Sequence, residues 1–579
     1  MNGNRPLLIT RVLLLALAMA FGGAPGGPVN AQSVQHLTIT QPGGMPGLPV
    51  MTGVTHLTNG VSVTWDGPPG SYQLFQKQSL KDASWQAVGS ASLLRQATIT
   101  ALSSNAFFRV SGPVPQYAGA QTCAECHAEV FNTVVHTAHA GAFAILPVVD
   151  QTNNSCLPCH TVGYQLPSGF TNLSITPHLA GVQCENCHGP AANHAANPAD
   201  PTTIPRVEVA STLCGGCHNT QFVPASAASY HPPYYEEWNS SPHRAVLDEL
   251  KADFATGAGP TVFIPTCGRC HSGTVREALL ENDILPDAHE SGAVGIACAT
   301  CHEPHAELVN TNVLNGIYLF TNLLTGNGIV ITNSELGAVY TNQLRNPLAS
   351  TNNYSMTDGP FASQYDPNIN LCAQCHNDRG ASWTNWTRPP HQSLQYNMLL
   401  GTVGELPSGT PPNLPGTHSQ LEKQCVACHM ETAPYQSVAQ PAIAGHGFQV
   451  QLFNVCNPCH GVGEGPRLVP FMNSIVSAGV SQLKGSLDSW ATNAAPLALR
   501  SYGTLAWEYA NPGGLSSGGL GPTNAALQSL INTNIQKARF NLYSVYNDGS
   551  GGVHNPFFTL NLLSNAQVWV QQQIAHPTP

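Results

Sequence analysis

The cysteines of this chain define its chemistry. All 18 fall into nine C-x-x-C pairs, and a histidine directly follows each pair. Two thiols at positions i and i+3 of a helical turn lie on one face, from which they can form thioethers with the two vinyl groups of one haem. The next residue, histidine, can then bind the iron as proximal ligand. The sequence therefore predicts nine covalent c-type haems with their iron. The motifs are Cys123, Cys126 and His127; Cys156, Cys159 and His160; Cys184, Cys187 and His188; Cys214, Cys217 and His218; Cys267, Cys270 and His271; Cys298, Cys301 and His302; Cys372, Cys375 and His376; Cys425, Cys428 and His429; and Cys456, Cys459 and His460.

Two other uses of paired cysteines explain this pattern less well. A disulfide framework has no use for a histidine after each pair. Zinc sites combine two C-x-x-C units and do not require histidine directly after each one. The histidine that follows every pair therefore favours haem attachment.

Each haem iron has a second axial position, which histidine, methionine or no residue can occupy. Between residues 117 and 475, eleven histidines lie outside the motifs, against four methionines, and one of these, Met430, directly follows a proximal histidine. Histidine is therefore the expected sixth ligand. The candidates are His139, His194, His243, His305, His391, His418, His446, His178, His231 and His289, with His136 (one turn from His139 and competing with it) and His554 as further options. We expect His36, His56 and His576 to be surface residues.

Ligation by two histidines makes the iron low-spin and coordinatively saturated. It also gives a lower reduction potential than His/Met ligation. Saturated iron exchanges electrons but offers no position for a substrate. The supply of histidines therefore favours electron transfer over substrate conversion.

The N-terminus has the features of an export signal. Arg5 and Arg11 precede a short apolar stretch at 12–21, and small residues end at Ala31. The stretch is shorter than the roughly 20 residues that span a bilayer, so we expect no transmembrane segment and a mature protein that begins at Gln32. We expect that protein in the periplasm, outside the cell or on its surface. Charged residues make up only 9% of the chain and its formal net charge is -11, so nucleic acid is not an expected partner.

The rest of the chain divides into three regions. Alternating segments in 32–113, namely HLTIT, VSVTWD, YQLFQ, WQAVG, ATITAL and AFFRV, predict a small antiparallel β-sandwich. The region 114–475 carries all nine motifs, so its core must consist largely of haems, with short helices at the motifs and irregular loops around them. Within it, 310–365 lacks cysteine but contains two strand-like segments, GIYLF and GIVIT. The region 476–579 is expected to be helical, with an amphipathic helix over 523–546 and a last helix that Asn555 caps and Pro556 begins.

Several stretches resemble multihaem cytochromes of the lineage that includes hydroxylamine oxidoreductase, the ammonia-forming nitrite reductase and the tetrahaem electron acceptor of hydroxylamine oxidoreductase. They are CAECHAEVFNTVVHTAHA, YYEEWNSSPHRA, CENCHGPAANH, CATCHEPH and ARFNLYSVYNDGSGGVHNP. The first four matches imply that His139, His243, His194 and His305 are haem ligands. The last resembles the lineage's C-terminal helical region and ends in Gly-Val-His-Asn-Pro, which contains His554. The β-rich region resembles fibronectin type III-like modules instead, with docking and a passive structural cap as alternative roles.

The departures from this lineage bear on function. Nitrite reductases of this kind replace one motif histidine with lysine, and no motif here does so. Hydroxylamine oxidoreductases crosslink a tyrosine to the catalytic haem, and nothing in this sequence marks such a tyrosine. The primary expectation is an extracytoplasmic electron carrier that exchanges electrons with redox partner proteins. One form of it uses an extracellular acceptor or assembles with itself into a filament. The alternative is an oxidoreductase that acts on a small nitrogen or sulfur compound, such as nitrite, hydroxylamine or tetrathionate, at one unsaturated haem.

Overall fold

The computed structural model describes residues 48–57, 60–79, 81–100, 106–205, 210–220, 230–248, 267–280, 294–305, 317–321, 328–332, 343–344, 371–411, 414–421, 424–516 and 519–577. The expected export signal, His36 and His289 lie outside these residues. So does most of the segment 310–365, apart from strands β7 (Ile317–Thr321) and β8 (Gly328–Thr332), which form an antiparallel hairpin where strand-like segments were expected.

The chain forms two compact units. The first comprises Met1–His231 and Glu303–Gln343, and the second comprises Pro232–His302 and Leu344–Pro579. The first four motifs therefore belong to one unit and the last five to the other. The division falls inside the region 114–475 that carries the motifs, and each unit is described separately below.

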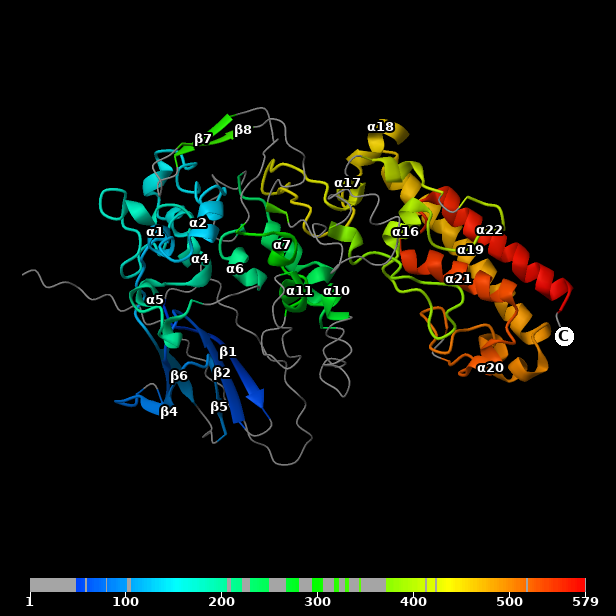
Figure 1. Cartoon of the computed structure of the whole chain (residues 1–579), viewed down its shortest axis with the longest axis horizontal. Coiled ribbons are helices and arrows are strands. Elements are labelled where there is room, and N and C mark those ends of the chain that lie inside the picture. Colours follow the sequence, from blue (N-terminus) through cyan, green and yellow to red (C-terminus); the bar gives the residue numbers. More distant parts are fainter. Residues whose placement is uncertain are drawn as a thin grey trace, which may run out of the picture. The chain divides into compact units, whose positions relative to one another are not determined.

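The first unit contains two three-stranded antiparallel sheets, visible in Figure 1. One has the order β1 (Val50–Leu57), β2 (Gly60–Asp66), β5 (Gln96–Ile99), and the other has the order β4 (Gln86–Ser92), β3 (Tyr72–Lys77), β6 (Phe107–Ser111). Alternate residues of β2 and β3 are buried, and Val63, Trp65, Tyr72 and Leu74 share one apolar cluster. Five strands coincide with expected segments, and the remaining expected segment, HLTIT at 36–40, lies outside the described residues. Strand β1 was not expected, because Gly53, Thr52 and Thr55 interrupt its apolar alternation.

Most haem motifs lie on single helical turns joined by loops. In five of them the histidine N–H donates to the carbonyl of the first cysteine, at N–O distances of 2.8 to 3.2 Å. This i+4 hydrogen bond brings both thiols and the imidazole onto one short turn. The motif-bearing helices are α1 (Ala120–Cys123), α3 (Leu157–His160), α4 (Cys184–His188), α6 (Ser211–Gly215), α10 (Arg269–His271), α12 (Cys298–Cys301), α17 (Gln424–His429) and α18 (Asn457–His460).

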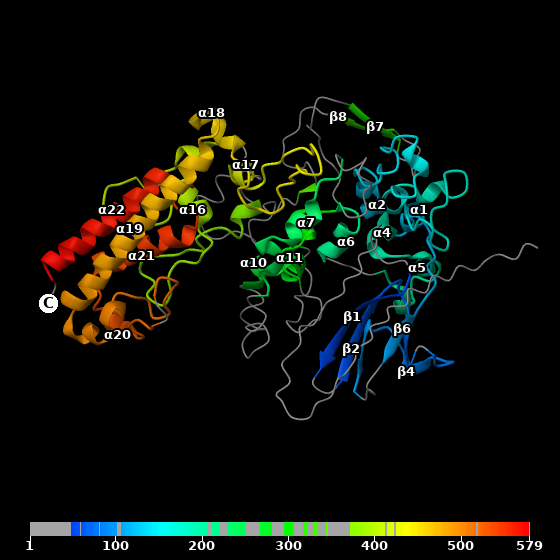
Figure 2. The ribbon, with the colours of Figure 1, turned by 180° about the vertical axis from the view of Figure 1, so that it is seen from behind.

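The second unit ends in long helices, and Figures 1 and 2 show α19 (Gly465–Asn493) and α22 (Pro556–Ala575) side by side. They share with α21 (Thr533–Asp548) the largest apolar core of the described residues, which includes Leu487, Trp507 and Leu562. The expected start of α22 is confirmed, since the Asn555 side chain accepts a hydrogen bond from Phe558 N and Pro556 follows it.

The helix expected over 523–546 is two helices. A short helix, α20 (Ala525–Gln528), ends first, and α21 then starts afresh behind Asn532, whose side chain accepts a hydrogen bond from Asn534 N. This new N-cap interrupts the apolar stripe that suggested one continuous helix. Helix α19 begins at Gly465, before the expected boundary at 476. Within the described residues, no helix is long and apolar enough to cross a membrane.

Candidate haem-binding sites

Eight of the nine motif histidines face a second histidine that is distant in the sequence. The ring centroids in these pairs are 5.9 to 6.4 Å apart. The pairs of the first unit are His218 with His139, His160 with His231, and His188 with His305. The pairs of the second unit are His376 with His243, His271 with His391, His302 with His446, His460 with His418, and His429 with His554.

This spacing fits one metal ion between two imidazoles. A bond between a metal and an imidazole nitrogen is about 2 Å long, so two such bonds plus the distance from each nitrogen to its ring centre give roughly the separations observed. No group of three or more His, Cys, Asp or Glu side chains among the described residues could hold a bare metal ion. Two axial imidazoles are what a haem iron needs, since the porphyrin supplies its other four nitrogens. The residues present therefore fit haem.

Several of these histidines have their Nδ1 atom fixed by a backbone carbonyl. His160 Nδ1 lies 2.5 Å from Ala142 O, His418 Nδ1 2.6 Å from Val553 O, and His446 Nδ1 3.0 Å from Ala444 O. A carbonyl can only accept, so Nδ1 must carry the proton and Nε2 keeps its lone pair for a metal. Such outer contacts orient ligand histidines in metal sites.

Two other ligand candidates are half-buried, and their Nδ1 atoms are buried without such a contact. The Nδ1 atoms of His243 and His391 have no hydrogen-bond partner among the described residues. Burial lowers the pKa of each imidazole to about 4, because a charged ring is disfavoured away from water. Both rings are therefore neutral at pH 7, which is the form that binds a metal.

Helix α7 (Tyr234–Asn239) positions the ligand candidate His446. The Glu237 carboxylate accepts hydrogen bonds from Ala444 N at 2.8 Å and from His446 N at 2.7 Å, and the Tyr234 ring lies 5.0 Å from the His446 ring. The YYEEWNSSPHRA segment was expected to supply only His243. Its Glu237 also holds a second candidate, His446, in place through backbone N–H groups.

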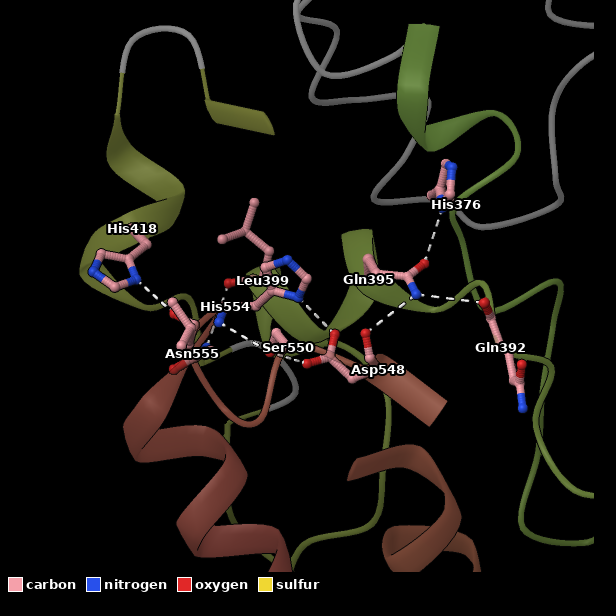
Figure 3. Close-up of polar contacts among 10 residues, drawn as sticks. His376, Gln392, Gln395, Leu399, His418, Asp548, Ser550, His554 and Asn555 are labelled. Atoms are coloured by element: carbon pink, nitrogen blue, oxygen red, sulfur yellow. Dashed lines mark hydrogen bonds and ion pairs between the residues drawn. The ribbon is translucent and has the colours of Figure 1, made fainter. Parts of the chain in front are cut away.

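A polar network surrounds the turn between α21 and α22 (Figure 3). His554 Nδ1 lies 2.6 Å from Asp548 Oδ1, and the Ser550 hydroxyl donates to the other carboxylate oxygen. Gln395 Nε2 donates to Asp548 O at 3.2 Å, while Gln395 Oε1 lies 3.2 Å from His376 Nδ1. Burial lowers the pKa of His554, but the charge and the hydrogen bond of Asp548 outweigh it and raise that pKa overall.

The first motif differs from the others. No ring faces His127 at the distances seen elsewhere in the described part of the chain. Two candidate ligands belong to segments that contact the residues just before α1. The ring of His178 lies against Gly119, the residue before α1, and is exposed. His194, in α5 (Ala192–Ala196), has a buried Nδ1 without a hydrogen-bond partner.

The spacer of the third motif holds this region together. The Glu185 carboxylate is 2% exposed and accepts hydrogen bonds from Gly119 N and Ala191 N, both at 2.8 Å, and from Ala118 N at 3.1 Å. It therefore ties the residues before α1 to the residues before α5, which carries His194. This role was not expected from the sequence. The glutamate between the cysteines of CENCH was no distinguishing signal, because CAECH also carries one, Glu125.

Motifs that are distant in the sequence meet through their cysteines. The side chain of Cys123 lies close to that of Cys184, as does that of Cys270 to Cys375 and that of Cys372 to Cys425. Cys159 Sγ lies 3.9 Å from Gly216 O in the fourth motif. Since each cysteine marks the edge of its own haem site, neighbouring sites adjoin within each unit.

Eight of the candidate ligands therefore lie opposite motif histidines. They are His139, His231, His243, His305, His391, His418, His446 and His554. His178, His194 and His136 face none at these distances. His289 lies outside the described residues, and the surface position expected for His576 agrees with its exposure.

Known proteins resemble parts of this chain. A family model described as cytochrome c554 and c-prime matches residues 122–189, which hold the first three motifs. The chain is 33% identical over 93 residues to cytochrome c-554 of Nitrosomonas europaea, a match that covers 13% of this chain and 40% of that protein. It is 22% identical over 172 residues to the multihaem cytochrome MtrA of Shewanella baltica, covering 28% of this chain and 48% of that one.

The chain therefore spans less than half the length of each of these curated relatives. Among solved structures, that of the outer cell wall cytochrome OcwA has a TM-score of 0.47 and 16% identity, over 79% of this chain and 100% of the other. The relatives matched in sequence are cytochromes, and their matches fall on a chain built from haem-attachment motifs.

Proposed function

We propose that this protein is a multihaem c-type cytochrome that carries electrons. The observation that carries the proposal is the set of eight histidine pairs, each with one motif histidine, at ring separations of 5.9 to 6.4 Å. The similarity of residues 122–189 to the cytochrome c554 family supports it independently.

Nine haems are expected, one for each motif. The two cysteines of a motif would hold the haem through thioethers, and the motif histidine would be its proximal ligand. The partner histidine of each pair would be the distal ligand. For the first motif we propose His194 as the distal ligand, because Glu185 ties α5 to the chain before α1 and because His194 Nδ1 is buried without a partner.

Bound in these sites, haem c supplies a one-electron Fe(III)/Fe(II) couple. The protein would keep the two imidazoles of each site neutral and fix their orientation. It would thereby leave no coordination position for another molecule. The contacts between cysteines of different motifs support transfer between neighbouring sites within each unit. If a motif histidine and its partner held each haem, no iron would offer a position for a substrate, which favours a carrier over the oxidoreductase alternative.

The proposal also covers the location of the protein, its partners and its domains. Export by residues 1–31 would place the protein in the periplasm or on the cell surface, where c-type haems are attached in bacteria. Its partners would be redox proteins, with an extracellular acceptor or further copies of the chain as additional options. The region 32–113 would be a fibronectin type III-like docking module or cap, 114–475 the nine-haem region and 476–579 a helical region.

Expression with haem-maturation machinery tests the proposal. We expect nine haems per chain by mass and by haem assay, low-spin ferric spectra throughout, and no spectral change on addition of nitrite, hydroxylamine or cyanide. A protein that carries fewer haems would contradict the count. A high-spin haem that binds these ligands would replace the carrier proposal with the oxidoreductase alternative.

A further inference from the structure

Asp548 occupies a position where a carboxylate is costly. It is the last residue of α21 and is 2% exposed. The C-terminus of a helix is the negative end of its dipole, which disfavours an anion, and burial of a charge adds to that cost. Residues that conflict with their local environment in this way are often kept for function.

What Asp548 contacts indicates the function. Its Oδ1 lies 2.6 Å from His554 Nδ1, and Ser550 donates to its Oδ2 (Figure 3). Gly549, with φ of 71°, ends the helix and turns the chain so that His554 returns to Asp548. The His554 ring also lies 6.2 Å from the ring of the motif histidine His429.

Other ligand candidates have weaker outer partners. Nδ1 of His160, His418 and His446 faces a neutral backbone carbonyl, and Nδ1 of His376 faces the neutral Gln395 amide. His305 also faces a carboxylate, that of Glu303, but at 3.2 Å and with the two side chains 49% and 22% exposed. The corresponding values for His554 and Asp548 are 21% and 1%. Solvent screens the attraction between His305 and Glu303, so the buried His554–Asp548 pair interacts more strongly.

We propose that Asp548, acting through His554, lowers the reduction potential of the haem site formed by Cys425, Cys428 and His429. The inference rests on the proposed function. A carboxylate that accepts the Nδ1 proton of a ligand imidazole makes that imidazole a stronger electron donor, and second-shell hydrogen bonds are one of the means by which a protein sets a haem potential. The stronger donor and the nearby negative charge both favour Fe(III).

The same residue reaches a second site. Gln395 donates its amide N–H groups to Asp548 O and to Gln392 O, at 3.2 and 3.4 Å. Its Oε1 is then left as an acceptor for His376 Nδ1–H. The main chain of Asp548 therefore fixes the orientation of Gln395 at the neighbouring site, while only the side chain bears charge. A substitution of the side chain separates these two roles.

Three variants of the haem-loaded full chain test the proposal in a mediated spectroelectrochemical cell. In Asp548→Asn, one haem of the nine is expected to be reduced more easily, with the ratio of reduced to oxidised haem raised at least tenfold at a fixed potential, a shift of about 59 mV for a one-electron couple. Ser550→Ala removes a donor from the carboxylate, concentrates its charge and should lower the same ratio. Glu303→Gln, the matched control at the more exposed pair, should change the ratio of reduced to oxidised haem at its own site less than twofold.

The low-spin ferric EPR signal of one haem should shift in Asp548→Asn and Ser550→Ala without loss of haem. If Asp548→Asn does not fold, the sign of the Ser550→Ala shift decides. Unchanged potentials in both variants, or shifts in the same direction, would overturn the role of Asp548. A wild-type protein without nine low-spin haems would instead contradict the proposed function, so the two failures are distinguishable.

Discussion

Replacement of His139 by alanine should leave one haem iron of the nine without its sixth ligand. The His139 ring lies 5.9 Å from the motif histidine His218. Its carbonyl accepts hydrogen bonds from Val182 N at 2.9 Å and Ala142 N at 3.0 Å, and neither depends on the side chain. The substitution should therefore remove an axial ligand and leave the local backbone in place. His136, three residues earlier and exposed, provides a matched control in the same turn segment after α2 (Ala128–Val134).

The magnitude follows from the number of sites. One of nine haems should lose its sixth ligand, so about 11% of the ferric haem should become high-spin. His136→Ala should leave all haems low-spin. His139→Met should keep the iron saturated where the methionine reaches it and should raise the potential of that single haem, because methionine ligation raises haem potentials.

Low-temperature EPR and resonance Raman spectra of the ferric proteins count the high-spin fraction. Added imidazole should return the His139→Ala protein to a fully low-spin spectrum, which distinguishes a missing ligand from a damaged fold. The reasoning would be refuted by a His139→Ala protein that stays entirely low-spin, or by a His136→Ala protein that shows the high-spin haem instead.

Three further predictions concern the first motif, the scaffold and the helical core. His194→Ala should create one high-spin haem and His178→Ala none, by the same EPR count; the reverse result would assign the first site to His178. Glu185→Gln replaces an acceptor of three backbone N–H groups and should lower the free energy of unfolding by roughly 3 kcal/mol, measured by denaturant titration, and an unchanged midpoint would contradict its role. Burial raises the pKa of Glu508 from 4.5 to about 7, so the folded state binds this proton more tightly and loses about 3 kcal/mol of stability as the pH rises across that range. Glu508→Gln should abolish this part of the pH dependence of unfolding, and a variant with the wild-type pH profile would exclude Glu508 as its source.

The proximal half of each candidate site was predictable from sequence, because two thiols and an imidazole within five residues need only one helical turn. The distal half was less so. His391 and His446 could be proposed only because the supply of histidines exceeded the number of motifs. His231 and His554 had no stronger signal than His178, which faces no motif histidine, because nothing local to a distal ligand records which motif will fold against it.

The hydrogen bonds that position the candidate ligands could not be predicted from the sequence, for the same physical reason. Glu185 binds backbone N–H groups more than 60 residues away in the chain, and Gln395 meets Asp548 across 153 residues. A carboxylate or amide that serves a distant backbone leaves no periodic pattern. Secondary structure was easier to predict where apolar residues alternate strictly, as in β2. It was harder to predict where an asparagine cap starts a new helix, as at Asn532.

The C-terminal helices do more in this unit than cover its haem region. Helix α16 (Gln395–Leu400) buries Met398 in the large apolar core and directs Gln395 towards His376 and Asp548. The turn between α21 and α22 supplies His554 itself and, through Val553 O, the acceptor for His418 Nδ1. Close-packed cores of this kind have low compressibility and hold their side chains in single rotamers, so ligands attached to them keep fixed orientations. A conventional core beside a region whose own core would be haem is therefore best understood as the rigid support that sets ligand geometry at three sites of the second unit.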